Sequence, residues 1–478
     1  MAVESINYQC PSCGGTMRYD GASGRLVCDF CGTAHLPSDI EAIYAARQAS
    51  ADASAEEASR RAEAGTLSEY EQMASGSGAA VALTDEVIAE AVNAQGADGG
   101  ADDPIASFLS RASWNESERA GLRSFTCSSC GASLTCDATT AVSECPYCGN
   151  TAVVPGTFVE TARPDLVVPF KVDKAAATAA LTAHYKGKRF LPKDFADANR
   201  IEHIQGVYVP FWLYDGTAEG SETFEARNVR THRSGDEEIT ETDIYSVYRA
   251  GEVGFTRVPA DASAKMPNGH MDAIEPFDYG SLVPFSLAYM PGYLAERFDE
   301  DAEACASRVH GRMRQSLEDE LRASVRGYDE VLSGSLDAQV RVESVSQALF
   351  PVWMLHTRWQ DGDYLFAMNG QTGRLVGDLP VSWGKVVLWF FGLFAVLCMV
   401  LSELDFGFLQ FDDTLASMLV DIGLPIVGAA SICAVFYSQM KTARERSEAH
   451  EYIDADGLEL SASQDTFIET RRSSRHLD

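Results

Sequence analysis

Apolar and polar positions in the middle of the chain repeat one order of predicted elements. A short apolar run that contains proline occurs at Val168–Phe170 and again at Val283–Phe285. Each run precedes a stretch in which apolar residues have helical spacing, and aspartate is favoured at the N-cap of a helix. We therefore expect one helix to begin near Asp173 and another near Asp299.

A second apolar run with an internal proline follows each predicted helix, at Val209–Trp212 and at Phe350–Trp353. Each leads into a strand pattern, so the order strand, helix, strand, hairpin occurs twice. Proline has no amide hydrogen for a sheet ladder, so we expect these strands at sheet edges or bulges. Asn369–Gly373 predicts a turn between strands. Residues 159–380 therefore predict an α+β domain of two related halves on antiparallel sheet.

Residues 37–113 have the composition of a helix followed by a linker. Ala, Glu and Arg dominate residues 37–66, so we expect a helix that starts at Pro37 and is exposed on most sides. Residues 67–110 are rich in Gly, Ser, Ala and Asp, which bury too little apolar surface to offset their ordering entropy. We expect an acidic flexible tether there, with a short helix at 84–93.

Two apolar runs follow the central block, within residues 381–440. Val386–Ser402 has no charge in 17 positions, and Leu415–Tyr437 has one charge, Asp421, in 23. A helix needs about 17 to 25 apolar residues to cross a bilayer. The pattern predicts a transmembrane helical hairpin, for which a buried hairpin of a soluble protein is the alternative. For Asp421 we favour snorkelling or helix pairing over an ion path.

Charges around the two apolar runs predict their orientation. The connecting loop has acidic residues and no Lys or Arg, whereas the outer flanks are basic, with Lys385, Lys441, Arg444 and Arg446. The positive-inside rule then places the N- and C-termini in the cytoplasm of a two-pass cell-membrane protein. Residues 441–478 form a mixed-charge cytoplasmic tail, in which we expect a short helix through Glu448 and disorder beyond it.

Eight of the twelve cysteines form two quartets of the same spacing, offset by 117 residues. Each quartet has two Cys-x-x-Cys pairs, and glycine follows each pair, where we expect it to let the backbone approach sulfur without a Cβ. Four thiolates at this spacing fit one tetrahedral zinc ion in a closed structural site. We predict two structural Zn²⁺ ions, in zinc ribbons at residues 1–36 and 114–158. The predicted ligands are Cys10, Cys13, Cys28, Cys31, Cys127, Cys130, Cys145 and Cys148.

Other ligands and cross-links fit this spacing less well. A disulfide framework suits small secreted domains, whereas this chain has 478 residues and begins without a secretory-signal pattern. Rubredoxin-like iron is the alternative metal. His35 follows Cys31 closely and is an alternative ligand, although four cysteines already complete the set. Cys136 corresponds to Tyr19 in the first quartet, so we expect a strand residue there.

Charge and motif content narrow the function classes. The chain has 70 acidic and 38 basic residues, a net charge of −32, and neither cysteine segment is basic. Nucleic-acid binding needs a basic surface, so composition counts against the transcription role that zinc ribbons often suggest. The sequence has no nucleophile elbow, His-Glu-x-x-His or glycine-rich phosphate loop, so we expect no enzyme. His203, His270 and His356 are separate in sequence and are candidates to converge in the fold.

Several stretches resemble the bacterial TFIIB-type zinc-ribbon membrane proteins, over roughly residues 115–385 and the predicted membrane hairpin. The stretches are Cys145–Asn150, Val168–Lys174, Gly206–Trp212, Leu282–Tyr293, Pro351–Met354 and Phe366–Gly373. The eight cysteines match the metal-binding turns of that family. The resemblance also implies a setting in envelope stress, because some relatives are encoded with phage-shock protein A-type and SPFH (flotillin-like) proteins.

These patterns favour a membrane-anchored cytoplasmic zinc-ribbon scaffold or recruiter, in envelope stress or membrane organisation. Its expected partners are the lipid bilayer and cytoplasmic or membrane-associated proteins, with phage-shock protein A-type and SPFH proteins as candidates. The alternative is a membrane-tethered nucleic-acid-binding protein. A hydrolase or transferase in the central domain and a transporter-like role of the hairpin are the remaining hypotheses.

Overall fold

The computed structural model describes residues 8–63, 114, 116–137, 140, 142, 144–151, 153–156, 163–198, 201–234, 237–360, 362–403 and 422–476. The tether expected at 67–110, with its short helix at 84–93, lies outside these residues. Asp421 and the first part of the second expected membrane span, from Leu415, also lie outside them.

Two long strands form the centre of a large mixed sheet. β8 (Gln205–Ser234) and β13 (Asp337–Trp359) pair antiparallel. β7 (Leu166–Val167) runs parallel to β13 on one side, and β11 (Leu294–Glu296) runs parallel to β8 on the other. The chain therefore has a mixed α+β fold, as its apolar pattern predicts.

The two proline-containing strands that we expected at sheet edges or bulges form the central pair, and neither proline lies at a bulge. Pro210 is opposite Leu349, and Pro351 is opposite Tyr208. Each proline sits where its strand changes its outer neighbour: β8 changes from β11 to β9 (Glu237–Asp261), and β13 changes from β7 to β14 (Gly362–Asn369). The expectation was wrong because a missing amide hydrogen is tolerated where the ladder is interrupted.

The two predicted helices are present, with one cap displaced. α6 (Lys174–Tyr185) begins after Asp173, whose carboxylate accepts a hydrogen bond from the Ala176 amide at 2.7 Å. α9 (Ala302–Ser324) is capped by Asp301 in the same way, rather than by Asp299. The Asp299 carboxylate instead accepts from the Ala264 amide at 2.8 Å, which ties the loop before α9 to the end of β9.

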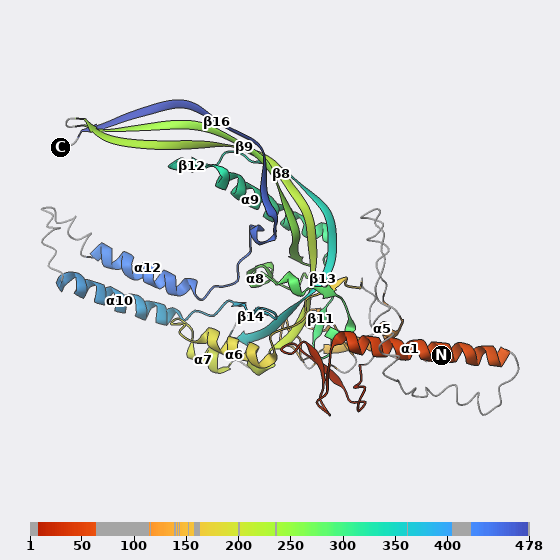
Figure 1. Ribbon diagram of the computed structural model, residues 1–478. Helices are drawn as coiled ribbons and strands as arrows, with labels where there is room; N and C mark the ends of the chain where they lie inside the picture. Colours follow the sequence, from red (N-terminus) through yellow and green to blue (C-terminus); the bar gives the residue numbers. More distant parts are fainter. Residues whose placement is uncertain are drawn as a thin grey trace.

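The outer parts of β8 and β9 form a long curved arm with a third strand, β16 (Ile453–His476) (Figure 1). β16 pairs antiparallel with β9 along most of its length. The expected short helix and disordered tail after residue 441 were therefore wrong. Polar composition did not prevent order here, because backbone hydrogen bonds to β9 make the tail part of the sheet.

Helices and ribbons cover the two faces of the central sheet. One face carries Tyr208 and Trp353 into a core shared with α6, and the other carries Val209 and Phe350 into a core shared with α8 (Asn268–Ile274).

The remaining short helices and strands of the central domain are α7 (Lys193–Ala198), β10 (Val283–Pro284), β12 (Glu330–Leu332) and β15 (Leu375–Gly377). The turn predicted at Asn369–Gly373 is confirmed, with the Gly373 amide bonded to the Asn369 carbonyl at 2.9 Å.

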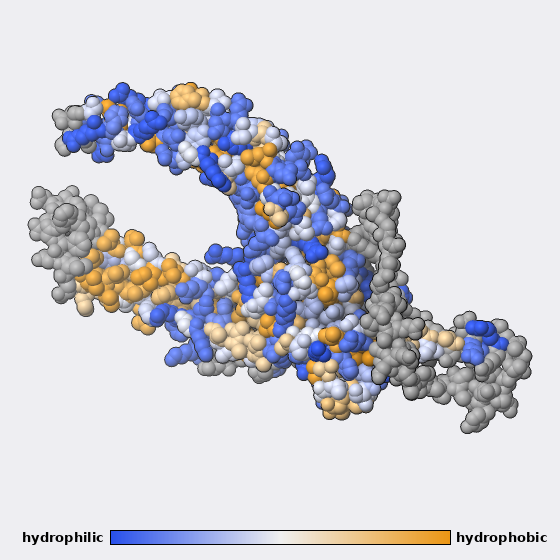
Figure 2. All heavy atoms as spheres, viewed as in Figure 1, coloured by the Kyte–Doolittle hydropathy of each residue, from blue (hydrophilic) through white to orange (hydrophobic). Residues whose placement is uncertain are grey.

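Two apolar helices pack side by side at one end of the molecule. α10 (Trp383–Glu403) and α12 (Leu424–Ser438) contact each other and expose apolar side chains on their outer sides, which form an orange surface in Figure 2. Trp383–Leu401 is long and apolar enough to cross a membrane, and α12 is a shorter apolar helix. Pro425 lies in the first turn of α12 rather than in its interior, a position where a missing amide hydrogen breaks no helical bond.

Both cysteine segments fold as small antiparallel ribbons. The first has β1 (Met17–Asp20), β2 (Arg25–Cys28) and β3 (Ala34–His35), followed by α1 (Pro37–Glu63), which starts at Pro37 as predicted. The second follows α5 (Glu116–Gly121) and has β4 (Leu122–Cys127), β5 (Ser133–Asp137) and β6 (Val153–Gly156). β5 also pairs with β11, so the second ribbon continues the central sheet.

Candidate metal centres and the surfaces around them

The predicted ligands converge into two four-cysteine clusters. Within each quartet the sulfur atoms all lie within 4.8 Å of one another. Cys10 and Cys31 are 3.5 Å apart, as are Cys13 and Cys28. In the second quartet the corresponding distances are 3.6 Å for Cys127–Cys148 and 3.7 Å for Cys130–Cys145. The two clusters of the sequence prediction are confirmed as groups able to hold two metal ions.

The sulfur geometry fits a tetrahedral ion. Metal–sulfur bonds of about 2.3 Å in a tetrahedron place sulfurs about 3.8 Å apart, close to the spacing in both clusters. His35 is not part of the first cluster, so the four cysteines form the donor set by themselves. Soft thiolate ligands in this geometry select zinc or iron over hard cations such as magnesium. All four positions of such an ion are filled by protein, which suits a structural role.

Each Cys-x-x-Cys pair is held by the same backbone turn. The amide of the glycine that follows each pair donates to the carbonyl of the pair's first cysteine, as from Gly131 to Cys127 at 2.9 Å. The four motif glycines all have positive φ, between 63° and 73°. A Cβ on Gly14, Gly32 or Gly131 would meet nothing within 4 Å. Glycine is therefore needed for the left-handed backbone, and not for close approach to sulfur as we expected.

The other thiols in the described ribbons and central domain are not placed as ligands. Cys136 is buried in β5, where burial raises the pKa of its thiol to about 12. Cys305 is buried in α9, and burial raises the pKa of its thiol to about 11. Both thiols stay protonated near neutral pH, consistent with the packing roles that the sequence predicts.

The first ribbon docks on the central sheet through Tyr19. The Tyr19 amide donates to the Pro291 carbonyl at 3.1 Å. Its ring makes edge contacts with Tyr289, at 5.3 Å between ring centroids, and with Tyr293, at 6.4 Å. Tyr293 in turn stacks on Phe170 at 4.1 Å, which lies within the main core. The first ribbon is therefore attached to the core rather than carried freely on its linker.

The second ribbon docks on the same short segment. Thr140 accepts a hydrogen bond from the Gly292 amide at 3.1 Å, and β5 pairs with β11 immediately after it. Residues 291–296 thus contact the first ribbon through Pro291 and the second through Gly292 and β11. Both ribbons have one fixed position relative to the central sheet because they share this segment.

The aromatic residue inside the second Cys-x-x-Cys pair is exposed in one ribbon and packed in the other. Phe30 and Tyr147 are equivalent under the 117-residue offset. Tyr147 packs against the central sheet, where its hydroxyl is enclosed near Glu296. Phe30 lies over Gly15 and is 78% exposed. The sequence analysis did not single out this pair, and only the fold distinguishes the buried aromatic from the exposed one.

Glu296 is a buried acid beneath the second ribbon. Burial raises the pKa of its carboxyl to about 8, against opposing contributions from Tyr147 and Ser263. Burial raises the pKa of the Tyr147 phenol well above its usual value, and the nearby Glu296 carboxyl adds to this shift. We infer that this carboxyl is largely protonated near neutral pH, which reduces the cost of enclosing it.

A hollow of about 460 Å³ lies where both ribbons meet the central domain. Arg18 and Asp20 line it from the first ribbon, and Glu144 from the second. The His203 Nδ1 is 2.6 Å from a Glu144 carboxylate oxygen at its wall. Charges of both signs line this hollow, and it is open to solvent, so it does not by itself select one ligand.

The three histidines that were candidates to converge have separate partners. His203 pairs with Glu144, whereas His270 Nε2 contacts the Leu365 carbonyl at 3.0 Å. His356 Nε2 is 3.4 Å from an Asp363 carboxylate oxygen. Burial lowers the pKa of both His270 and His356. They do not form a common catalytic or metal site.

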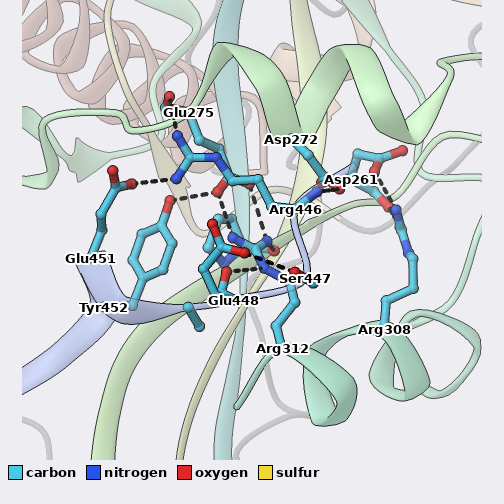
Figure 3. Close-up of polar contacts among 12 residues, drawn as sticks. Asp261, Asp272, Glu275, Arg308, Arg312, Arg446, Ser447, Glu448, Glu451 and Tyr452 are labelled. Atoms are coloured by element: carbon cyan, nitrogen blue, oxygen red, sulfur yellow. Dashed lines mark hydrogen bonds and ion pairs between the residues drawn. The ribbon is translucent and has the colours of Figure 1, made fainter. Parts of the chain in front are cut away.

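A buried polar network joins the segment after α12 to the central domain (Figure 3). Arg312 donates two hydrogen bonds to Glu275, at 3.2 and 2.7 Å. From the C-terminal segment, the Tyr452 hydroxyl donates to the same carboxylate at 2.9 Å, and Arg446 donates to the Glu275 carbonyl at 2.9 Å. This network fixes the chain between the apolar helices and β16, a structural role that the sequence motifs did not reveal.

Comparison with known proteins places the chain in a family. It is 33% identical over 232 residues to "Uncharacterized protein YdjG" of Bacillus subtilis (strain 168), a match that covers 48% of this chain and 67% of the relative. The chain belongs to the YdjG family. No protein-family model matches the chain, and no solved structure matches it. Membership of the YdjG family names no activity.

Proposed function

We propose that this YdjG-family protein is a membrane-anchored scaffold that presents two fixed zinc ribbons to a cytoplasmic protein. The observation that carries the proposal is the shared docking segment, residues 291–296, which holds both ribbons on one sheet. Mobile ribbons would act as separate domains, whereas fixed ribbons form one composite surface. That surface lies on the same domain from which the apolar helices extend (Figure 1).

Zinc is the ion that we assign to both clusters. The two ribbons are too small to fold on a hydrophobic core alone, so the metal's binding free energy contributes to their folding. Iron in a rubredoxin-like site remains the alternative that the four-sulfur geometry also accepts. Neither cluster offers an open coordination position, so the metal's role is to hold the surface in shape.

The apolar helices are the proposed membrane anchor, a two-pass hairpin with both termini in the cytoplasm. The 19 residues of Trp383–Leu401 span about 28 Å as a helix, close to the roughly 30 Å hydrocarbon core of a bilayer. Lys385 and Lys441 lie at the ends next to the central domain, where they contact Leu191 and Asp378. Because basic residues favour the cytoplasmic side, the ribbons and central domain lie in the cytoplasm under this proposal.

The curved arm constrains how the helices meet a bilayer. Figure 1 shows the arm extending in the same direction as α10 and α12, and Figure 2 shows open space between its polar surface and the helices. The arm carries exposed charged side chains such as Arg230 and Arg472. Charged groups are excluded from hydrocarbon. Under this proposal the helices therefore insert in an orientation that leaves the arm outside the hydrocarbon.

Phe30 is the proposed contact of the scaffold with its partner. A large aromatic that is exposed on a rigid turn loses little conformational entropy on binding and is a typical interface anchor. Tyr147, its equivalent, shows this use within the same chain by packing against the central sheet. Following the family resemblance, we propose phage-shock protein A-type or SPFH proteins as the partners.

We also propose that the central domain is a duplication, because Pro210 and Pro351 hold matching places in its paired strands.

The test is chemical cross-linking in intact cells followed by purification of the full chain from membranes. We compare the wild type with Phe30→Ser and with Phe467→Ser, a matched change at an exposed phenylalanine on β16. The scaffold proposal predicts cross-links to phage-shock protein A-type or SPFH proteins that Phe30→Ser removes and Phe467→Ser retains. Cross-links only to nucleic acid, or none that depend on Phe30, would contradict it.

A further inference from the structure

The loop between α6 and α7, together with the first residue of α7, brings a basic segment to the base of the apolar helices. Residues 186–193 contain Lys186, Lys188, Arg189 and Lys193 and no acidic residue, in a chain of net charge −32. These residues precede α10 by almost two hundred positions, so sequence proximity did not reveal the relationship. Figure 1 shows α6 and α7 at the near end of α10.

Specific contacts fix the loop against both apolar helices. The Arg189 guanidinium lies over the Trp389 ring of α10, at 4.6 Å from its centroid, and over the Phe436 ring of α12, at 5.2 Å. The Lys188 ammonium donates to the Gln439 carbonyl at 2.7 Å, just after α12 ends. From α10, the Lys385 ammonium donates to the Leu191 carbonyl of the loop at 2.5 Å.

Most of the charge on this loop is not neutralised by protein. Lys186, Arg189 and Lys193 are exposed, and within the described residues none of the three makes an ion pair. Lys441 nearby differs, because it pairs with Asp378 at 2.8 Å. Asp194 follows the loop directly and leaves the segment net positive. Unpaired cations beside tryptophan at the end of an apolar helix match the headgroup level of a bilayer.

We propose that residues 186–193 bind the phosphate groups of anionic phospholipids. The inference rests on the proposed insertion of α10 and α12, and it adds the lipid class that the anchored protein recognises. Basic side chains near a membrane surface are attracted to anionic leaflets over a Debye length, whereas the rest of this acidic chain is repelled. The loop therefore orients the central domain on the bilayer, with α7 facing the headgroups.

Hydrogen exchange in lipid nanodiscs tests this inference with the full-length protein. Phosphatidylcholine nanodiscs are compared with nanodiscs in which part of the lipid is phosphatidylglycerol. We expect the amides of residues 186–193 to exchange about tenfold more slowly with phosphatidylglycerol, and high salt to reduce the difference. Protection of the α10 amides in both nanodiscs reports insertion separately, so failure of anchoring and failure of lipid recognition give different results.

A charge-matched pair of variants provides the control. Lys186→Gln/Arg189→Gln/Lys193→Gln removes three positive charges from the loop, and Arg471→Gln/Arg472→Gln/Arg475→Gln removes three from β16. The first variant should lose the phosphatidylglycerol-dependent protection while the α10 amides stay protected, and the second should keep it. Equal exchange in both lipids for the wild type overturns the proposal. Equal protection by inorganic phosphate in phosphatidylcholine nanodiscs overturns it too, since it would indicate a free-phosphate site.

Discussion

Arg312 and Glu275 form a two-pronged ion pair inside the protein, with side-chain exposures of 5% and 1%. The pair joins α9 to the end of α8, and Tyr452 adds the C-terminal segment by donating to the same carboxylate at 2.9 Å. Two charges are removed from water here, so the geometry must satisfy both. The pair thus connects three parts of the chain that are remote in sequence.

Arg312→Met should strongly destabilise the protein. The substitution leaves the Glu275 carboxylate buried without its cation, a change that typically lowers the free energy of unfolding by about 3 to 5 kcal/mol. Denaturant unfolding of the detergent-solubilised protein measures the loss. Arg312→Met/Glu275→Leu removes both charges and should recover part of it. A loss below about 1 kcal/mol for the single variant would show that the pair is not buried as described.

Stability should fall as pH rises through the range in which Glu296 ionises. Its folded pKa, about 8, is raised above the unfolded value of about 4.3, so the folded state holds the proton more tightly. Stability from this group is complete below the unfolded pKa and is lost as pH rises through the folded pKa, by up to about 1.4 kcal/mol per pH unit.

Thermal unfolding of the zinc-loaded protein between pH 6 and pH 8.5 checks this dependence, because the chosen range avoids acid release of the metal. Glu296→Gln keeps a similar shape without an ionisable group and should flatten the decline. Asp261, whose pKa burial raises to about 6, should add a decline only at the lower end of this range, and that part should be the same in the wild type and in Glu296→Gln. An unchanged slope in Glu296→Gln would refute the assignment.

Two glycine substitutions should act through different physical causes. Gly131→Ala places a side chain at φ +73° with nothing within 4 Å, so only backbone strain of about 1 kcal/mol is expected. Gly206→Ala places a Cβ 2.6 Å from the Tyr293 ring, which overpacks the core and should destabilise by about 1 to 3 kcal/mol.

Melting temperature and zinc content together separate these causes. Gly206→Ala should lower the melting temperature more than Gly131→Ala while both retain two metal ions per chain. Because Tyr293 also contacts Tyr19, Gly206→Ala should in addition make the first ribbon more accessible to protease. Equal effects of the two variants would count against the close approach of Tyr293.

Metal analysis should find two zinc ions per chain, each with four sulfur neighbours at about 2.3 Å by X-ray absorption. Cys28→Ser/Cys31→Ser and Cys145→Ser/Cys148→Ser should each lose one ion. The second variant should lower the melting temperature further, because its ribbon shares a ladder with β11. Iron in place of zinc would leave the fold account intact and correct the metal assignment.

Local chemistry explains what the sequence could predict. Cysteine spacing identified the two clusters, since a tetrahedral ion demands four nearby donors, and Asp173 identified a helix start through its cap. The same rule pointed to Asp299, but Asp301 is the cap, because two acidic positions two residues apart satisfy the same local preference. Such signals depend on a few neighbouring residues and can be recognised from the sequence without the fold.

Long-range pairing explains what the sequence could not predict. β16 is a strand because β9, about two hundred residues earlier in the chain, pairs with it, although the composition of β16 is polar. Pro210 is central because the outer neighbour of β8 changes at that point. Phe30 and Tyr147 occupy equivalent positions in the two cysteine motifs, and the position of each ribbon on the sheet decides which is exposed.

Labelling from within the bilayer tests most directly the claim on which the account depends, that α10 and α12 are membrane-embedded. A photoactivatable reagent confined to the hydrocarbon is added to membranes that contain the full chain, and modified peptides are identified by mass spectrometry. The account predicts modification of residues 386–402 and 422–437, and none of the arm or the ribbons. Unmodified helices, or modification of the arm residues 226–246, would contradict it.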